Sequence, residues 1–213
     1  MTGEITPELL LRAYAMGIFP MAETRASDDV FWVDPDHRGI IPLDGFHMSR
    51  SLRKRIRQEP FAITTDRDFA GVVAGCADRK ETWINETIHD LYMRLHRAGF
   101  AHSLEVWDGP DLVGGVYGVT LGGAYFGESM FSRRRDASKI ALAYLVDRLR
   151  IGGYRLFDTQ FLTPHLASLG GVEITREDYH DMLEDALQVT ADFIAPGRAP
   201  PAYWLLHRSI QTS

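Results

Sequence analysis

The sequence predicts an α/β (α+β) fold built around a meander of three strands. Three strand-like segments follow one another between residues 102 and 131, and turn signals at Gly109-Pro110 and Gly122-Gly123 separate them. A long amphipathic helix, a further strand and a last helix are predicted to follow in that order. This alternation of strands and helices is typical of a globular α+β domain.

The composition is that of a globular protein with enough apolar residues for a core. The chain has 213 residues, of which 45% are hydrophobic, and its formal net charge is -6. Because the whole chain is acidic, contact with a nucleic acid would depend on a local basic patch. A single cysteine excludes an internal disulfide and fits a reducing cytosol, and the apolar runs are too short for a membrane span.

Residues 1–80 are predicted to form a small α/β unit. Thr6 is followed by proline, which is typical of a helix start, and Gly17 is expected to end that helix. Two short strands are expected in "VFWVDP" (residues 30–35) and "RGIIPL" (residues 38–43).

Two further helices have start signals. Apolar residues recur at helical spacing from Phe69 to Cys76, and either Thr65 or Asp66 is expected to cap that helix. Asn85 is expected to cap the next helix, which Gly99 would end.

Residues 81–195 are predicted to form the larger domain, which contains the meander. A broad apolar stripe over residues 136–150 predicts a long helix, and "YRLFDTQF" (residues 154–161) predicts a strand. Residues 175–193 predict the last helix. The tail, residues 196–213, is rich in proline and then apolar, and is expected to pack on the surface.

A polar pair interrupts the apolar strand 154–161. Because side chains alternate along a strand, Asp158 and Gln160 would share a face about 7 Å apart. Burying both groups costs free energy unless they are hydrogen-bonded. The pair is therefore either a satisfied structural pair or a pair that orients a polar group of a substrate.

Glu128 is a second candidate, because it follows directly after Gly127 at the end of a predicted strand. Taken alone, it is typical of an exposed glutamate on a strand. If its strand lies beside that of Asp158, the two carboxylates would form a site that suits a cation.

Two basic segments stand out in this acidic chain, "SRSLRKRIR" at residues 49–57 and "SRRRDASK" at residues 132–139. Basic runs are often solvated surfaces, but arginines and helix N-termini also bind phosphates. The side chains predicted to bind phosphates are Arg50, Arg53, Lys54, Arg57, Arg133, Arg134 and Lys139.

Several common sites are absent from the sequence. "GESMF" is not the G-x-S-x-G nucleophile motif, and no phosphate-binding loop of the Walker type occurs. His96, His102 and Glu105 lack a recognised zinc spacing. The sequence therefore predicts neither a metal site nor a bound cofactor.

Several long motifs resemble those of the leucyl/phenylalanyl-tRNA–protein transferase family. They run in order over residues 9–175 and include "AYAMGIFPM", "FWVDPDHRGIIPL", "FHMSRSLRK", "LYMRLHRAGFAHSLEVW", "FGESMFSRRRDASKIAL" and "FDTQF". The resemblance implies a small N-terminal α/β domain joined to a GNAT-like acyltransferase domain with a mixed, mostly antiparallel sheet. The glycine-containing acetyl-CoA loop is absent before the long helix, which argues against acetyl-CoA as donor.

The resemblance implies a cytoplasmic bacterial enzyme of the N-degron protein degradation pathway. It would move leucine or phenylalanine, with methionine as a further candidate, from aminoacyl-tRNA to the α-amine of a protein that begins with Arg or Lys. The expected partners are the 3′ acceptor end of the tRNA and such a protein or peptide. Neither a membrane nor DNA is an expected partner.

The resemblance also implies roles for individual residues. Asp158 and Gln160 match the family's catalytic acid and amide, and Glu128 and Asp158 would bind the N-terminus of the acceptor. Asp158 would either take the proton of the amine or only orient it through Gln160, while a tRNA ribose hydroxyl carries the proton. The residues expected around the aminoacyl-adenosine are Trp32, Trp83, Tyr92, Val116, Met130, Leu142, Leu145 and Leu149.

Three other functions would fit parts of the sequence. A GNAT-type acetyltransferase would need acetyl-CoA, and a non-catalytic RNA-binding module would need only the basic segments. A transferase that prefers acidic N-termini is the third, and two carboxylates near the reacting amine argue against it.

Overall fold

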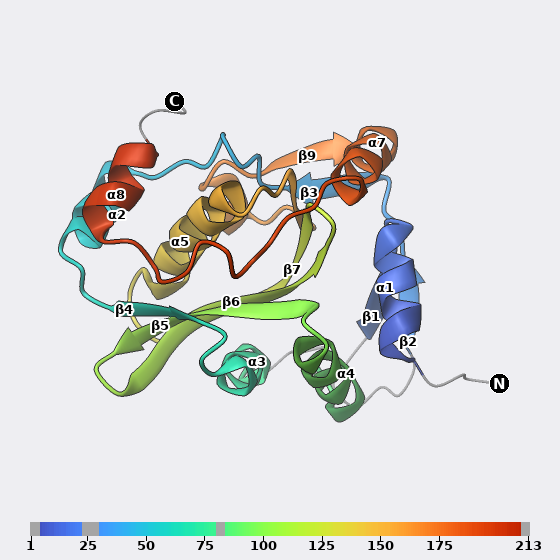
Figure 1. Cartoon of the computed structure of the whole chain (residues 1–213), viewed down its shortest axis with the longest axis horizontal. Coiled ribbons are helices and arrows are strands. Elements are labelled where there is room, and N and C mark those ends of the chain that lie inside the picture. Colours follow the sequence, from blue (N-terminus) through green and yellow to red (C-terminus); the bar gives the residue numbers. More distant parts are fainter. Residues whose placement is uncertain (1–4, 23–29, 80–83, 210–213) are drawn as a thin grey trace.

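The computed structural model describes residues 5–22, 30–79 and 84–209. Its main sheet has seven strands in the order β4-β5-β6-β7-β8-β3-β9, and β1 and β2 form a separate antiparallel pair. Helices α3 and α4 cover one face of the main sheet and α5 covers the other (Figure 1). The predicted α/β class is confirmed.

The first helix forms as predicted. Helix α1 spans Pro7–Ala15, and the hydroxyl of Thr6 accepts a hydrogen bond from the backbone N–H of Leu9 at 3.2 Å. Gly17, two residues after the helix, has φ 76°, a left-handed conformation that glycine adopts without strain.

Strands from both sides of residue 80 belong to one sheet. β1 (Phe19–Ala22) pairs with β2 (Val30–Val33), but β3 (His37–Ile40) lies between β8 and β9 in the main sheet. β4 (Ala62–Thr65), which the sequence analysis missed, pairs antiparallel with β5. The sheet is thus continuous across the expected domain boundary, and the division of the chain at residue 80 stays a prediction.

The predicted cap of the third helix is wrong. α3 spans Phe69–Ala77, and its N-cap is Asp68 rather than Thr65 or Asp66. Asp66 has a left-handed backbone with φ 53°, and its carboxylate accepts a hydrogen bond from the backbone N–H of Ser103 at 2.7 Å. The side chain of Asp66 therefore joins the turn before α3 to the neighbouring strand and is not available to the helix.

The first basic segment forms a helix, and the Asn85 cap is confirmed. α2 spans Arg50–Arg57 and is capped by Ser49. α4 spans Glu86–Arg97, and the side-chain oxygen of Asn85 accepts a hydrogen bond from the N–H of Ile88 at 2.8 Å.

The predicted meander is confirmed. β5 (Ala101–Asp108), β6 (Asp111–Leu121) and β7 (Ala124–Ser132) pair antiparallel in sequence order. α5 (Ala137–Ile151) then crosses one face of the sheet, and β8 (Leu156–Gln160) pairs with β7 in parallel. The sheet is therefore mixed and mostly antiparallel, as expected.

The C-terminal part contains shorter elements than predicted. After α6 (Pro164–Ala167), β9 (Val172–Thr175) forms a sheet edge, and α7 (Arg176–Leu187) ends before the predicted end of the last helix. The tail forms α8 (Ala202–Arg208). None of the described helices has the length and hydropathy that crossing a membrane requires.

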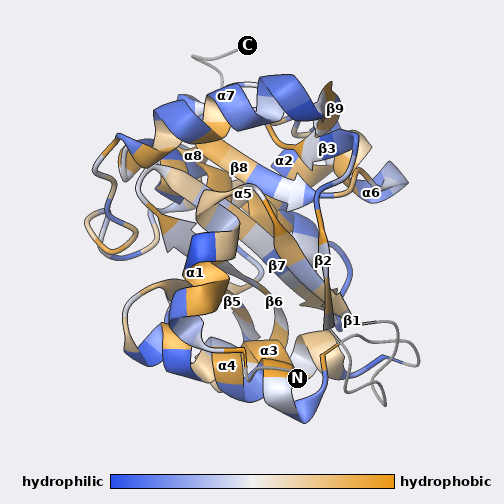
Figure 2. Cartoon of the chain, turned by 90° about the vertical axis from the view of Figure 1, so that its right-hand side faces the viewer, coloured by the Kyte–Doolittle hydropathy of each residue, from blue (hydrophilic) through white to orange (hydrophobic). Residues whose placement is uncertain are grey.

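Apolar side chains form two clusters, one on each face of the main sheet. One cluster gathers around α5 and includes the inner residues of α8. The other gathers around α1, α3 and α4. Figure 2 shows hydrophilic residues along the outer side of α7, which lies at the surface. Burial of these two clusters holds the central strands, and with them the polar residues of β7 and β8, in place.

Candidate active site

The candidate site lies where β7 and β8 stop pairing. The two parallel strands form three register pairs, from Ala124 with Leu156 to Phe126 with Asp158. Beyond the last pair, residues of both strands line an open pocket of about 310 Å³. The end of the strand pairing thus leaves a gap in the sheet in which a ligand can reach backbone and side chains of both strands.

The walls of this pocket are largely apolar. Side chains from β6, β7, β8, α5 and the segment after β8 form them: Val116, Met130, Leu142, Phe157, Phe161 and Leu166. The structure therefore brings together three of the predicted aminoacyl-binding residues, Val116, Met130 and Leu142. The two phenylalanines were not among the predicted residues. A pocket of this size, at the small end for ligand sites, suits one amino-acid side chain.

The other predicted aminoacyl-binding residues lie elsewhere or outside the described part of the chain. Leu145 and Leu149 follow Leu142 on α5, are fully buried in the core and do not line the pocket. Trp32 lies on β2 with 39% of its surface exposed. Trp83 lies outside the described residues. Tyr92 is fully buried and does not line the pocket either. The contacts of these five residues with an aminoacyl-adenosine stay predictions.

Glu128 forms a polar part of the pocket, and a β-bulge places it there. Tyr117 pairs with Ser129 and Gly118 pairs with Gly127, so Glu128 has no partner on β6. Bulges of this kind redirect side chains and are frequent beside active sites. The position of Glu128 is therefore a property of the strand register, which the sequence pattern alone does not reveal.

Three side chains hold the Glu128 carboxylate. The hydroxyl of Tyr14 donates to Oε1 and that of Tyr92 donates to Oε2, each at 2.6 Å. The amide of Gln160 donates to Oε1 at 3.1 Å. Burial raises the pKa of Glu128 to about 7, and the hydrogen bonds from the two tyrosines limit the rise. Glu128 can therefore both hold and release a proton near neutral pH.

Asp158 has a different environment, because both of its oxygens are taken by protein donors. Arg38 donates from Nε to Oδ1 at 2.9 Å and from Nη2 to Oδ2 at 2.6 Å. Tyr179 donates to Oδ2 at 2.8 Å, and the backbone N–H of Gln160 donates to Oδ1 at 2.7 Å. Asp158 is fully buried and does not line the pocket. Its geometry favours the orienting role over that of a base.

Gln160 links the Asp158 ion pair to Glu128. Its backbone has φ 62°, a left-handed conformation that is uncommon for residues other than glycine. The Asp158 carboxylate accepts the Gln160 N–H, while the Gln160 side chain reaches Glu128. The simple alternation expected for this strand therefore fails at Gln160. Hydrogen bonds run without a break from Arg38 through Asp158 and Gln160 to Glu128.

Three residues of this network were not predicted from the sequence: Tyr14, Arg38 and Tyr179. Tyr14 lies on the apolar stripe of the first helix, where its ring is part of the core, so its hydroxyl gave no separate signal. Arg38 did leave a signal, because it is a charged residue at the start of a short apolar strand. The guanidinium of Arg38 lies 4.4 Å from the ring centroid of Phe19 and 4.3 Å from that of Tyr179.

The second basic segment is paired with acidic side chains. Arg133 lies 3.2 Å from Asp78, and Arg134 lies 3.5 Å from Asp108. Lys139 is half-buried. These pairs are exposed and therefore weak, but they reduce the positive charge that the segment presents to a phosphate.

The first basic segment keeps its charge. α2 carries five cationic side chains and no acidic one. Within residues 5–22, 30–79 and 84–209, none of these five forms an ion pair with a carboxylate. Of the two predicted phosphate-binding segments, α2 thus has the larger uncompensated charge.

Comparison with known proteins identifies the family of the chain. Residues 40–184 match the family described as leucyl/phenylalanyl-tRNA protein transferase, and residues 3–36 match the N-terminal domain of that family. The chain belongs to the leucyl/phenylalanyl-tRNA–protein transferase family. The resemblance seen in the sequence motifs is confirmed.

Two relatives named leucyl/phenylalanyl-tRNA–protein transferase cover nearly the whole chain. The protein from Ruegeria sp. (strain TM1040) is 66% identical over 209 residues, which are 98% of this chain and 99% of that protein. The protein from Cereibacter sphaeroides (strain ATCC 17025) is 64% identical over 209 residues, 98% of each chain. The predicted enzyme class, an aminoacyltransferase that uses aminoacyl-tRNA and a protein, is confirmed.

The crystal structure of FemX is similar in fold. Its TM-score is 0.51 at 12% sequence identity, and the match covers 82% of this transferase and 70% of FemX. Identity this low shows a shared fold alone.

Proposed function

We propose that this transferase moves leucine or phenylalanine from aminoacyl-tRNA to the α-amine of a protein N-terminus, and that Glu128 accepts the proton of that amine. The observation that carries the proposal is the position of Glu128. A carboxylate with a pKa near 7 faces an apolar pocket of single-side-chain size. The leucyl or phenylalanyl side chain would occupy that pocket, with its ester carbonyl beside Glu128.

The reaction forms an amide bond and breaks an ester bond. The neutral amine attacks the ester carbonyl, the ester carbon–oxygen bond breaks, and the ribose oxygen leaves with a proton. The acceptor α-amine has an ordinary pKa of about 8, so it must lose one proton before attack and another during it. A base works best when its pKa lies near the working pH, which favours Glu128 over an ordinary carboxylate.

Asp158 and Gln160 act in this proposal as positioning residues. Asp158 holds the left-handed backbone of Gln160, and the Gln160 amide in turn holds Oε1 of Glu128. A fully buried carboxylate that accepts four hydrogen bonds has no free lone pair aimed at a substrate. The Gln160 amide is closer to the reacting groups, since it touches Glu128 itself.

The proposed acceptors begin with Arg or Lys. Glu128 is negative above its pKa, so the site favours a positively charged acceptor end and repels an acidic one. Asp158 is ion-paired with Arg38, so Glu128 is the carboxylate among the described residues that line the pocket; the lining also includes the cationic Arg79. The donor, an aminoacyl-tRNA, is made in the cytosol, and we propose that the enzyme works there.

A transfer assay with peptides tests the proposed function. Purified protein is given labelled Leu-tRNA or Phe-tRNA and peptides that begin with Arg, Lys, Asp or Met. Label is expected on the Arg and Lys peptides only. Label on the Asp peptide would overturn the acceptor class, and absence of transfer to every peptide would overturn the proposal as a whole.

Charge reversal on α2 is expected to weaken tRNA binding more than reversal in the second basic segment. The double variant Arg50→Glu/Lys54→Glu should raise the Kd for tRNA roughly tenfold or more at low salt. It should also lower the slope of log Kd against log salt concentration by about two units, because each lost phosphate contact lowers that slope by about one unit. The matched control is Arg133→Glu/Arg134→Glu, whose arginines already contact acidic residues. Equal slopes for the two variants would contradict the assignment of α2.

A further inference from the structure

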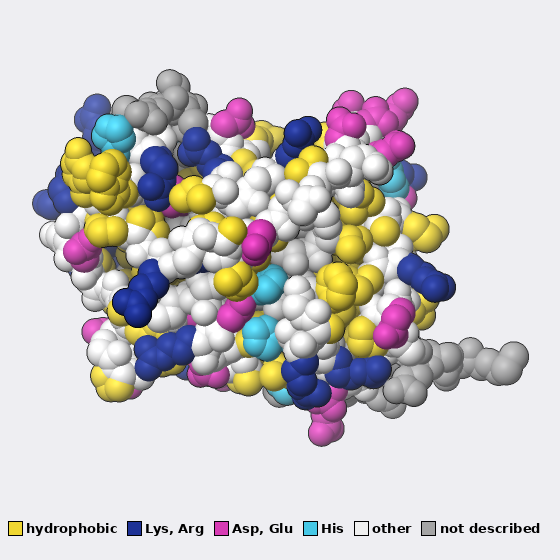
Figure 3. All heavy atoms as spheres, viewed as in Figure 1, with side chains coloured by type: hydrophobic (Ala, Val, Ile, Leu, Met, Phe, Trp, Pro, Cys, Tyr) yellow, Lys and Arg dark blue, Asp and Glu magenta, His cyan; other side chains and the backbone are white. Residues whose placement is uncertain are grey.

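An aromatic surface lies on the outer side of α8. Tyr203 and Trp204 are 67% and 53% exposed, and their ring centroids are 5.3 Å apart. The His207 ring lies 6.0 Å from that of Tyr203. Figure 3 shows hydrophobic side chains gathered over α8, with Lys and Arg side chains around them. A cluster of large rings in water is unusual for a protein surface and marks a contact site.

The exposure of these rings does not come from a loose helix. On the inner side of α8, Ala202, Leu205 and Leu206 are buried in the core cluster around α5. Arg208 forms an ion pair with Asp147 of α5 at 2.5 Å. The helix therefore has a complete apolar face without its outer rings, and these rings are available to a partner.

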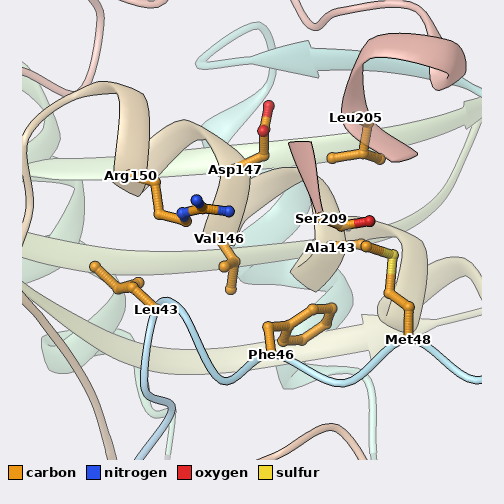
Figure 4. Close-up of a pocket in the computed structure, with 9 residues that line it drawn as sticks. All are labelled: Leu43, Phe46, Met48, Ala143, Val146, Asp147, Arg150, Leu205 and Ser209. Carbon is orange, nitrogen blue, oxygen red and sulfur yellow. The ribbon is translucent and has the colours of Figure 1, made fainter. Parts of the chain in front are cut away.

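The contact between α8 and α5 is closely packed. Figure 4 shows Ser209, the residue that follows α8, beside Ala143 of α5. The residues drawn there enclose a cavity of only about 20 Å³, room for about one water molecule. Such a contact holds the backbone of α8 in place, so the backbone that carries the outer rings is already ordered before a ligand stacks against them.

α2 supplies the charge that identifies the partner. It packs on α8, and Arg53 donates to the Ser209 side chain at 3.1 Å. Arg50, Lys54 and Arg57 are exposed. Proteins that bind unpaired nucleotides usually combine two features. Cationic side chains bind the phosphates, and neighbouring aromatic rings stack on the bases.

We propose that α2 and α8 form one binding surface for the donor tRNA, in which Tyr203 and Trp204 stack on nucleobases while α2 binds the adjacent phosphates. The proposal rests on the proposed function, because that function makes a tRNA the donor. α5 connects the two sites: its residue Leu142 lines the active-site pocket, and the helix also packs on α8. A tRNA whose aminoacyl end enters the pocket is long enough to reach α8 as well.

Removal of the rings tests this surface. The variant Tyr203→Leu/Trp204→Leu is expected to raise the Kd for uncharged tRNA roughly 25-fold or more, since the loss of each stacked base costs about fivefold or more. Tyr203→Phe/Trp204→Phe keeps the rings and should retain most of the affinity. Leu9→Ala, at an exposed apolar position on α1, is the control and should leave the Kd unchanged. We call the two double variants the leucine pair and the phenylalanine pair. An equal loss of tRNA affinity in both would overturn the stacking role.

A short donor separates this proposal from the proposed function. Leucyl-adenosine carries the reacting ester but is too small to reach α8 from the pocket. The leucine pair should transfer from leucyl-adenosine at the wild-type rate and show a raised KM for Leu-tRNA. If the wild-type protein transfers from neither donor, the proposed function fails. If it transfers from both and the leucine pair binds tRNA normally, only the α8 surface is overturned.

The same variants test other partners for the rings. Sedimentation with vesicles that contain anionic lipid would detect a membrane surface, and light scattering over a range of protein concentrations would detect a second copy of the chain. The proposal would be overturned if the wild type binds vesicles or self-associates, the leucine pair does not, and the Kd of the leucine pair for tRNA is unchanged. No change in vesicle binding or mass is expected.

Discussion

Glu128→Gln is expected to lower the rate of aminoacyl transfer by roughly a hundredfold or more, because loss of a general base costs that much. Glutamine has nearly the shape of glutamate and can keep contacts with Tyr14 and Tyr92, but it cannot take the proton of the amine. The rate is measured in a single turnover with bound Leu-tRNA and a peptide that begins with Arg. The Kd for tRNA should stay within about twofold of the wild-type value.

A stability measurement shows that this loss is not a loss of folding. Burial raises the pKa of Glu128 from 4.5 to about 7, so between these values the folded state keeps a proton that the unfolded state has released. The free energy of unfolding therefore falls as the pH rises through this window. Glu128→Gln removes that dependence, and at pH 8 its Tm should equal or exceed that of the wild type. A much lower Tm would contradict this reading of the site.

The second large effect is expected at the buried ion pair. Arg38→Met leaves the carboxylate of Asp158 buried without its cation, and we expect the free energy of unfolding to fall by about 3–5 kcal/mol. Urea denaturation measures this change. The matched control is Arg133→Met, which removes one side of the exposed contact with Asp78 and should cost no more than about 1 kcal/mol.

A paired variant separates the structural role of this ion pair from its role in positioning. Arg38→Met/Asp158→Leu removes both charges and should regain at least half of the lost stability, since apolar residues can replace a buried pair. The Gln160 backbone would still lack the acceptor that holds its left-handed conformation, so transfer should stay low. Recovery of full transfer would show that Asp158 and Arg38 only support the fold.

The elements that short-range patterns control were predicted well. The caps at Thr6 and Asn85, the meander and α5 all depend on residues that are close in sequence, and the structure confirms them. One exception is the start of α3, where the Asp66 carboxylate accepts a hydrogen bond from a strand far along the chain. In the sequence, the Asp66 carboxylate fits a helix cap as well as it fits a hydrogen bond to a strand. The position of the neighbouring strand in the sheet decides between these two roles.

Features that depend on strand order could not be predicted. β3 lies between β8 and β9, which brings Arg38 to Asp158 across 120 positions of sequence. The bulge at Glu128 belongs to the pairing of β6 with β7, and Gln160, with its left-handed backbone, pairs with Gly39 of β3. The polar strand motif left open whether Asp158 takes a proton or only orients the amine. The ion pair with Arg38 favours the orienting role, and Glu128 faces the pocket.

The most direct test of the central claim is the single-turnover transfer rate as a function of pH, for the wild type and Glu128→Gln. The wild-type rate should rise through an inflection near pH 7, the pKa of Glu128, and again near pH 8, where the acceptor amine loses its proton. The glutamine variant should keep only the second inflection. Identical profiles for both proteins would contradict the role of Glu128 as the proton acceptor.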